Sequence, residues 1–273
     1  MTHGWLYRRK SATGVAQSKS SAGFTLIEML MVILLIGLIV SIALPGLKGM
    51  KRSNTIANAN RQLLDDLSLA RQRAILGRTT VRVMFVPPTI ADNSMTFNTA
   101  DKQDMAVAKQ LQTGAYTTYA LFAERAIGDQ PGVSSFRYLS SWKTLPDGVF
   151  IADREFKYYT VQDWKDNFGN SWAVRPFEYL PMPFPTINGK TNLVPQIAFG
   201  PSGGLVDESG NPLTDGEVIE LARGSILSQR DPSGYVLNFD VQEIPPNNSI
   251  NNYNHIVIDG LTGRARIEQP QIQ

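Results

Sequence analysis

The stretch Gly23-Phe24-Thr25-Leu26-Ile27-Glu28 opens an apolar run that continues from Met29 to Leu47 without a charged residue. A helix over residues 24–47 would be about 36 Å long at roughly 1.5 Å per residue, and the hydrocarbon core of a bilayer is about 30 Å thick. Residues 24–47 are therefore predicted to span a membrane as one helix. Glu28 is the single acid in this segment, and an ionised carboxylate there is costly unless it has a partner.

Residues 1–23 are polar and basic, include no acid, and are expected to form an unstructured cytoplasmic leader. Removing this leader takes away four of the 26 basic residues and leaves 22 basic against 24 acidic residues, a formal charge of −2. The remaining chain lacks the strongly basic balance that is typical of nucleic-acid-binding domains. A general affinity for nucleic acid is therefore not expected.

A cut before Phe24 would give Glu28 a partner. The new α-amino group would be a cation one helical turn from the carboxylate, and in a bundle of staggered helices the amine of one chain would neutralise Glu28 of its neighbour. An ordinary secretory signal is the competing interpretation, because Ser41-Ile42-Ala43 follows the apolar core as a small-x-small cleavage site does. A discarded signal has no use for Glu28, which favours the first interpretation.

The hexapeptide Gly23 to Glu28, in register with the apolar run, resembles the processing motif of type IV pilins and type II secretion pseudopilins. The resemblance implies that prepilin peptidase cuts between Gly23 and Phe24 and methylates Phe24, and that Glu28 acts in assembly. It also implies a single-pass protein held in inner-membrane lipid, with a cytoplasmic leader and a periplasmic head. The protein would then assemble with other pseudopilins or pilins into a periplasmic or extracellular filament.

Residues 48–77 continue the helix as an amphipathic segment that ends at Gly77, which is suited to a helix C-cap. Apolar residues separated by seven, four, three and four positions fall on one helical face; they are Ile56, Leu63, Leu67, Ala70 and Ala74. Asp65 and Asp66 fall on other faces and are expected to be solvated.

Residues 78–273 are expected to form a β-rich extracytoplasmic head. Thr79–Val86 alternates apolar and polar residues as a half-buried strand does. Further strands are predicted over 116–124, 149–152, 193–199, 217–223, 235–241, 255–258 and 264–267. Insertions near 89–113, with a short helix over 104–112, and near 155–190, an aromatic-rich loop anchored to the core, interrupt this pattern. The predicted fold class is α+β and pilin-like, with a long N-terminal helix packed on a C-terminal antiparallel sheet.

The long helix with Leu69-Ala70-Arg71, the strands that follow it, and a closing hairpin with Thr262-Gly263-Arg264 together resemble minor pseudopilins of the GspH/FimT type. This resemblance implies a structural subunit of a type II secretion or type IV pilus-like filament. It leaves open which of these filaments the chain belongs to.

The sequence offers little material for catalysis. It has no cysteine, its only histidines are His3 and His255, and it contains no GxSxG, GxxxxGK or HExxH motif. We therefore predict no enzymatic activity, no catalytic residue, no cofactor and no metal. One acidic loop carries oxygen ligands of the kind calcium prefers, although solvated acids are the expected state; its members are Asp207, Glu208, Asp215 and Glu217.

Arg264 and Arg266 are two positions apart on a predicted strand and would face the same way. Paired arginines suit phosphate groups, and some minor pilins of this type contact DNA. A DNA-binding minor pilin of an uptake apparatus is therefore one alternative to the structural subunit. An ordinary secreted protein with a removable signal peptide is the other.

Overall fold

A computed structural model of the chain describes residues 24–92, 94–125, 129, 135–157, 162–165, 171–174, 176–232, 234–251 and 254–268. Their side chains are described as well, except at 42–54, 162–165 and 171–174. The predicted leader, with Gly23, lies outside the described residues. The chain divides into two compact units, Met1–Gly49 and Met50–Gln273.

The helix α1 spans Leu26–Gly77, 52 residues, and passes through both units. It ends in a Schellman motif, in which the N–H groups of Arg78 and Thr79 donate to the carbonyls of Ile75 and Ala74. Gly77, predicted as the C-cap, is the last helical residue, and the left-handed conformation falls on the next residue, since Arg78 has a φ of 47°.

The five apolar residues predicted on one face of this helix are all buried, and the same hydrophobic cluster includes residues of both large sheets. Asp66 was expected to be solvated, and this expectation is wrong, since its residue is only 5% exposed. Its carboxylate accepts a hydrogen bond from the Tyr119 hydroxyl at 2.7 Å and lies 2.5 Å from Lys143 Nζ. Partners from two strands therefore hold this helical acid inside the fold.

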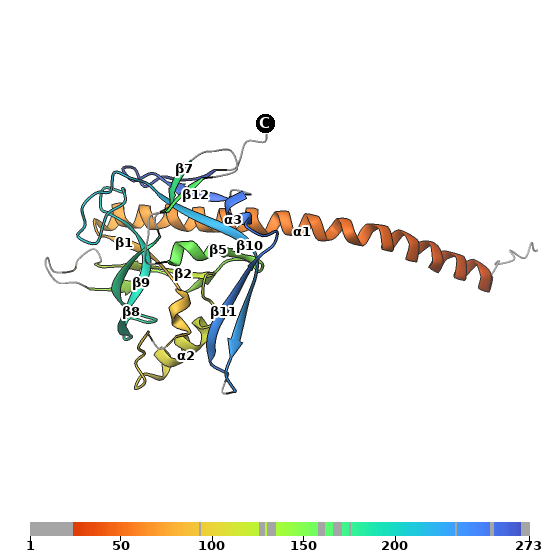
Figure 1. Ribbon diagram of the computed structural model, residues 1–273, viewed down its shortest axis with the longest axis horizontal. Coiled ribbons are helices and arrows are strands. Elements are labelled where there is room, and N and C mark those ends of the chain that lie inside the picture. The colour runs from red at the N-terminus through yellow and green to blue at the C-terminus, as the bar shows by residue number, and fades with distance from the viewer. Residues whose placement is uncertain are drawn as a thin grey trace, which may run out of the picture. The chain divides into compact units, whose positions relative to one another are not determined.

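Residues 50–273 contain two large antiparallel sheets (Figure 1). The first has the order β3-β2-β1-β9-β8, with β4 also pairing β2. Its strands are β1 (Val81–Phe85), β2 (Thr118–Ala123), β3 (Arg137–Tyr138), β4 (Lys143–Thr144), β8 (Glu178–Phe184) and β9 (Lys190–Phe199). The second has the order β11-β10-β12-β13, with β5 pairing β10. Its strands are β5 (Val149–Ile151), β10 (Glu217–Arg230), β11 (Val236–Glu243), β12 (His255–Ile258) and β13 (Ala265–Glu268).

The central strand β1 is buried on both faces, so the prediction that it is half-buried is wrong. Its polar residue Arg82 is held inside by hydrogen bonds to Glu124 at 2.5 and 2.9 Å and to Gln196 at 3.2 Å. The sequence pattern predicted an exposed position because arginine is polar, whereas these hydrogen bonds allow Arg82 to occupy a core position.

The two predicted insertions contain regular structure. In the first, a short 3₁₀ turn, η1 (Pro88–Ile90), precedes α2 (Lys102–Leu111), which begins two residues before the predicted helix because the Asp101 side chain caps its N-terminus. The second was predicted as a loop, and this is wrong: it contains η2 (Asp153–Phe156), the hairpin of β6 (Gln162–Lys165) and β7 (Ser171–Val174), and β8. Its Phe177 is buried and stacks on Phe85 at 4.4 Å between ring centroids, which anchors this region to the core.

The closing hairpin β12–β13 contacts the last turns of α1. Arg71 Nε donates to the carbonyl of Thr262 at 2.7 Å. Beside it, Gly263 has a φ of 61°, and a Cβ on this residue would overlap the carbonyl oxygen of Gly203. The turn between β12 and β13, which contains Thr262 and Gly263, therefore lies close to both the helix and the loop that contains Gly203.

Candidate functional site

Thr25 and Glu28 form a capping box at the start of α1. The Glu28 N–H donates to Thr25 Oγ1 at 3.3 Å, and Glu28 Oε2 accepts from the Thr25 N–H at 3.3 Å and from its hydroxyl at 3.4 Å. This reciprocal arrangement satisfies two backbone donors that helix geometry leaves free, and it places a negative charge at the positive end of the helix dipole. The Thr-x-x-Glu spacing of Thr25 and Glu28 is the sequence signal from which this capping box could have been predicted.

The surface of α1 that follows this box is apolar. Phe24 is 74% exposed, and large apolar side chains remain exposed as far as Val40. A contiguous apolar surface of this extent marks a site of contact with lipid or protein. Within the described part of the chain, none of the helices has the combination of length and apolar character that crossing a membrane requires. The predicted span of residues 24–47 includes 42–47, which lie outside the residues whose side chains are described.

Of the residues predicted for processing and assembly, the structure describes Phe24 and Glu28, and both lie at the exposed start of α1. The two hydrogen bonds that the Glu28 carboxylate accepts from Thr25 both end at Oε2, so Oε1 can accept a further donor. An amine created at Phe24 would lie at the same end of the helix. The local geometry therefore allows one carboxylate to cap its own helix and to bind a cation at the same time.

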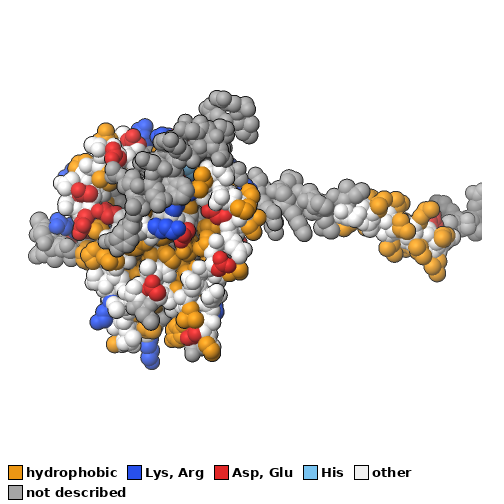
Figure 2. Space-filling model, viewed as in Figure 1, with side chains coloured by type: hydrophobic (Ala, Val, Ile, Leu, Met, Phe, Trp, Pro, Cys, Tyr) orange, Lys and Arg blue, Asp and Glu red, His pale blue; other side chains and the backbone are white. Residues whose placement is uncertain are grey.

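Arg264 and Arg266 are both exposed. Arg266 lies on β13, one of the two edge strands of the second sheet, whereas Arg264 was predicted on the same strand but lies just before it. Arg266 forms a hydrogen-bonded ion pair with Glu268 at 2.6 Å, which neutralises part of the predicted basic pair. Figure 2 shows acidic and basic side chains interspersed on the visible face of residues 50–273. DNA contact through these two arginines stays a prediction.

The acidic loop does not gather its carboxylates. Asp207 accepts from the backbone N–H of Asn211 at 2.8 Å and from its side-chain amide at 3.1 Å, and these hydrogen bonds hold the pKa of Asp207 below its usual value. Among the described residues, no three His, Asp or Glu side chains lie together in a way that could hold a metal ion. Asp207 is therefore a turn-forming acid of its own loop.

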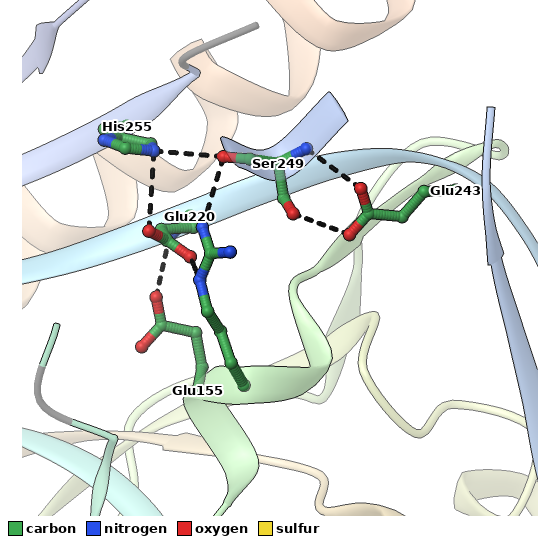
Figure 3. Close-up of polar contacts among 6 residues, drawn as sticks. Glu155, Glu220, Glu243, Ser249 and His255 are labelled. Atoms are coloured by element: carbon green, nitrogen blue, oxygen red, sulfur yellow. Dashed lines mark hydrogen bonds and ion pairs between the residues drawn. The ribbon is translucent and has the colours of Figure 1, made fainter. Parts of the chain in front are cut away.

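A buried polar cluster, not predicted from the sequence, joins η2, β10, β12 and α3 (Asn248–Asn251) (Figure 3). Glu155 is fully buried, and its Oε1 accepts from the Glu220 N–H at 3.1 Å. The Glu220 carboxylate makes a close ion pair with Arg154 and lies 3.6 Å from His255 Nε2. His255 Nε2 also lies 3.2 Å from the carbonyl oxygen of Ser249.

Burial sets the protonation of this cluster. Desolvation raises the pKa of Glu155 well above its usual value, although the charge of Arg154 opposes the shift. Desolvation also lowers the pKa of His255, so near neutral pH its imidazole is uncharged and can donate to Ser249. The hydrogen bonds and ion pairs of this cluster connect four elements of the fold.

Comparison with known proteins identifies one part of the chain. Residues 18–44 match a family model described as a prokaryotic N-terminal methylation motif. No curated protein and no solved structure matches the chain. The match includes Gly23, Phe24 and Glu28, and Glu28 lies in the first turn of α1. The chain therefore carries the N-terminal methylation motif of type IV pilin-like proteins, the motif that prepilin peptidase processes.

Proposed function

We propose that this protein is a structural minor pseudopilin of the GspH/FimT type, a subunit of a type II secretion or type IV pilus-like filament. The observation that carries the proposal is the methylation motif over residues 18–44, coinciding with a capped, apolar helix start. In this proposal the chain has no enzymatic activity and uses neither cofactor nor metal. Its function is assembly with other pilin-like subunits.

Before assembly, the leader is cytoplasmic, the apolar start of α1 is held in inner-membrane lipid, and residues 78–273 form a periplasmic head. Prepilin peptidase cuts between Gly23 and Phe24 and methylates the new N-terminus. The apolar side chains from Phe24 to Val40 then leave lipid and pack against equivalent helices, which keeps their surface away from water. The filament is periplasmic or extracellular.

Glu28 sets the stagger between neighbouring helices in this proposal. Its Oε2 remains in the capping box with Thr25, and its Oε1 accepts from the Phe24 amine of the neighbouring subunit. When an ion pair is desolvated between helices, removing one partner destabilises the packed helices by about 3 to 5 kcal/mol, because the other charge stays buried without a partner. Loss of the carboxylate should therefore prevent incorporation into the filament.

N-terminal sequencing and mass spectrometry of the mature protein test the processing step. The expected mature chain begins at Phe24 and carries one additional methyl group. A mature chain that begins at Leu44 would show ordinary signal cleavage and would refute the proposal.

Filament incorporation of Glu28→Gln and Thr25→Val tests the assembly step. Glu28→Gln removes the charge but keeps the shape, and should abolish incorporation. Thr25→Val removes the hydroxyl of the capping box, costs about 1 kcal/mol of helix stability, and should leave incorporation measurable. If both variants behave alike, Glu28 acts only as a cap.

A further inference from the structure

Strands β10 and β11 form a ribbon that extends beyond the rest of their sheet (Figure 1). β10 pairs with β12 through Glu217–Glu220 and with β5 through 221–223. From Gly224 to Arg230, β10 pairs only with β11 within the described residues. We call the segment Gly224 to Glu243 the ribbon.

The hydrogen bonds of β10 show which of its backbone groups are unpaired. The Arg223 carbonyl accepts from the Ile244 N–H at 2.8 Å on the β11 side, and the Gly224 N–H donates to the Gly148 carbonyl at 3.1 Å on the opposite side. Because successive residues of a strand point their backbone groups to alternate sides, those of Ile226 and Ser228 point to the Gly148 side. In the described part of the chain, no backbone hydrogen bond reaches either residue on this side.

The chain that could have paired with these groups turns away. The Val149 N–H donates to the Pro146 carbonyl at 3.2 Å in a tight turn where Gly148 has a φ of 81°, and the Leu145 N–H donates to the Thr117 carbonyl at 2.9 Å. This turn leaves a hollow of about 380 Å³ beside β10. We call it the slot, and its walls include Thr113, Thr117, Thr144 and Pro146 on one side and Ile226, Ser228 and Phe239 on the ribbon.

The outer edge of β11 differs from the edge that lines the slot. There the Phe239 N–H, which points away from β10, donates to the side-chain oxygen of Asn238 at 2.8 Å. Such a local bond protects an edge from pairing with another chain, and the slot edge of β10 has no equivalent bond at Ile226 or Ser228 in the described structure. The ribbon also exposes large apolar side chains, with Leu227 53% and Leu237 59% exposed.

We propose that the slot binds an extended segment of another protein, which adds to β10 as an antiparallel strand in line with β5. Alternating N–H and C=O groups along an open strand edge are complementary to another extended polypeptide, and the slot walls would then select its side chains. The segment would place an apolar residue over Ile226 and Phe239, and a basic residue near Asp147 on the slot wall. This proposal rests on the ribbon alone and does not depend on the N-terminal assembly step.

The Ser228→Pro variant tests the proposal, because proline removes the N–H that faces the slot and leaves the β10–β11 hydrogen bonds in place. Ser228→Ala is the matched control that keeps the N–H. Val241→Pro is a second control, since Val241 pairs with Ile226 but points its N–H away from β10. Loss of one backbone hydrogen bond together with the unpaired partner group should weaken binding about tenfold.

The assay is photo-cross-linking of the full chain in cells of the source organism, with p-benzoylphenylalanine in place of Thr113 on the slot wall. The expected result is a discrete product with another protein that Ser228→Ala and Val241→Pro retain and Ser228→Pro loses. The proposal is overturned if no product forms, if the product survives Ser228→Pro, or if it consists of two copies of this chain. Amide exchange of the purified chain adds a second measurement: Ser228 should exchange faster than Leu227, and equal protection would show that no open edge exists.

Discussion

Asp66→Ala tests whether the buried acid of α1 fastens the helix to the sheet. The Asp66 carboxylate, 8% exposed, accepts from Tyr119 and pairs with Lys143, whose side chain is 36% exposed. Desolvation and the hydrogen bond to Asp66 both raise the pKa of Tyr119, so its hydroxyl stays protonated and needs an acceptor. Gln62 contacts the same hydroxyl as a donor and cannot replace the carboxylate as acceptor.

The expected cost follows from these contacts. A buried donor that loses its partner costs about 1 to 3 kcal/mol, and a hydrogen bond to a charged group is at the upper end of that range. The half-exposed ion pair with Lys143 adds at most about 1 kcal/mol, because water screens it. We therefore expect Asp66→Ala to lower the free energy of unfolding by about 2 to 4 kcal/mol.

Urea unfolding of the full chain in detergent, followed by tryptophan fluorescence, measures this change. Asp65→Ala is the matched control, because this neighbouring acid is exposed and its removal should change stability by about 0.5 kcal/mol or less. In a Tyr119→Phe background, Asp66→Ala should cost about 1 to 2 kcal/mol less than in the native chain. Equal effects of the two aspartate substitutions would refute this account of how the helix is held.

Three further predictions concern the buried cluster and the glycine loops. Because burial raises the pKa of Glu155, the folded state binds its proton more tightly than the unfolded state, and Glu155 contributes stability at acid pH that is lost as pH rises through the raised pKa. In urea unfolding measured against pH, Glu155→Gln should make this fall in stability less steep. An unchanged slope would contradict the assignment. His255 acts in the opposite sense, since its lowered pKa removes stability as pH falls below about 6.5. In thermal unfolding, Gly263→Ala should cost about 2 to 4 kcal/mol of stability, because an added Cβ meets the Gly203 carbonyl. The control Gly210→Ala should cost about 1 to 2 kcal/mol, since Gly210 has a φ of 82° but lies in open space. Equal losses would mean that backbone conformation alone determines the cost at both glycines.

The parts of the fold that were predictable are those encoded by local periodicity. The buried face of α1 could be predicted because apolar residues repeat at helical spacing, and most strands because turn residues separate them. The misjudged residues are polar ones whose partners are distant in sequence. Asp66 is buried because Tyr119 and Lys143 bond to it, and Arg82 because Glu124 and Gln196 do.

The candidate site divides in the same way. The order of glycine, phenylalanine and glutamate before an apolar run is local, and the sequence alone was enough to place Phe24 and Glu28 at the helix start. The slot beside β10 could not be predicted, because it depends on where the turn before Val149 directs the chain relative to a strand some 75 residues later. Whether a strand edge is open depends on which strands pair with it, and the composition of the strands does not show this.

The bond between Arg71 and the carbonyl of Thr262 has a consequence for the order of folding. The last turns of α1 are among the first parts of residues 50–273 to be synthesised, yet the loop that fits against them is among the last. Contacts between segments so far apart in sequence form slowly, because the entropy of closing the intervening loop must be overcome first. Residues 50–273 therefore complete their packing only after synthesis has passed Gly263, and a chain that stops short of this hairpin would expose the end of its helix.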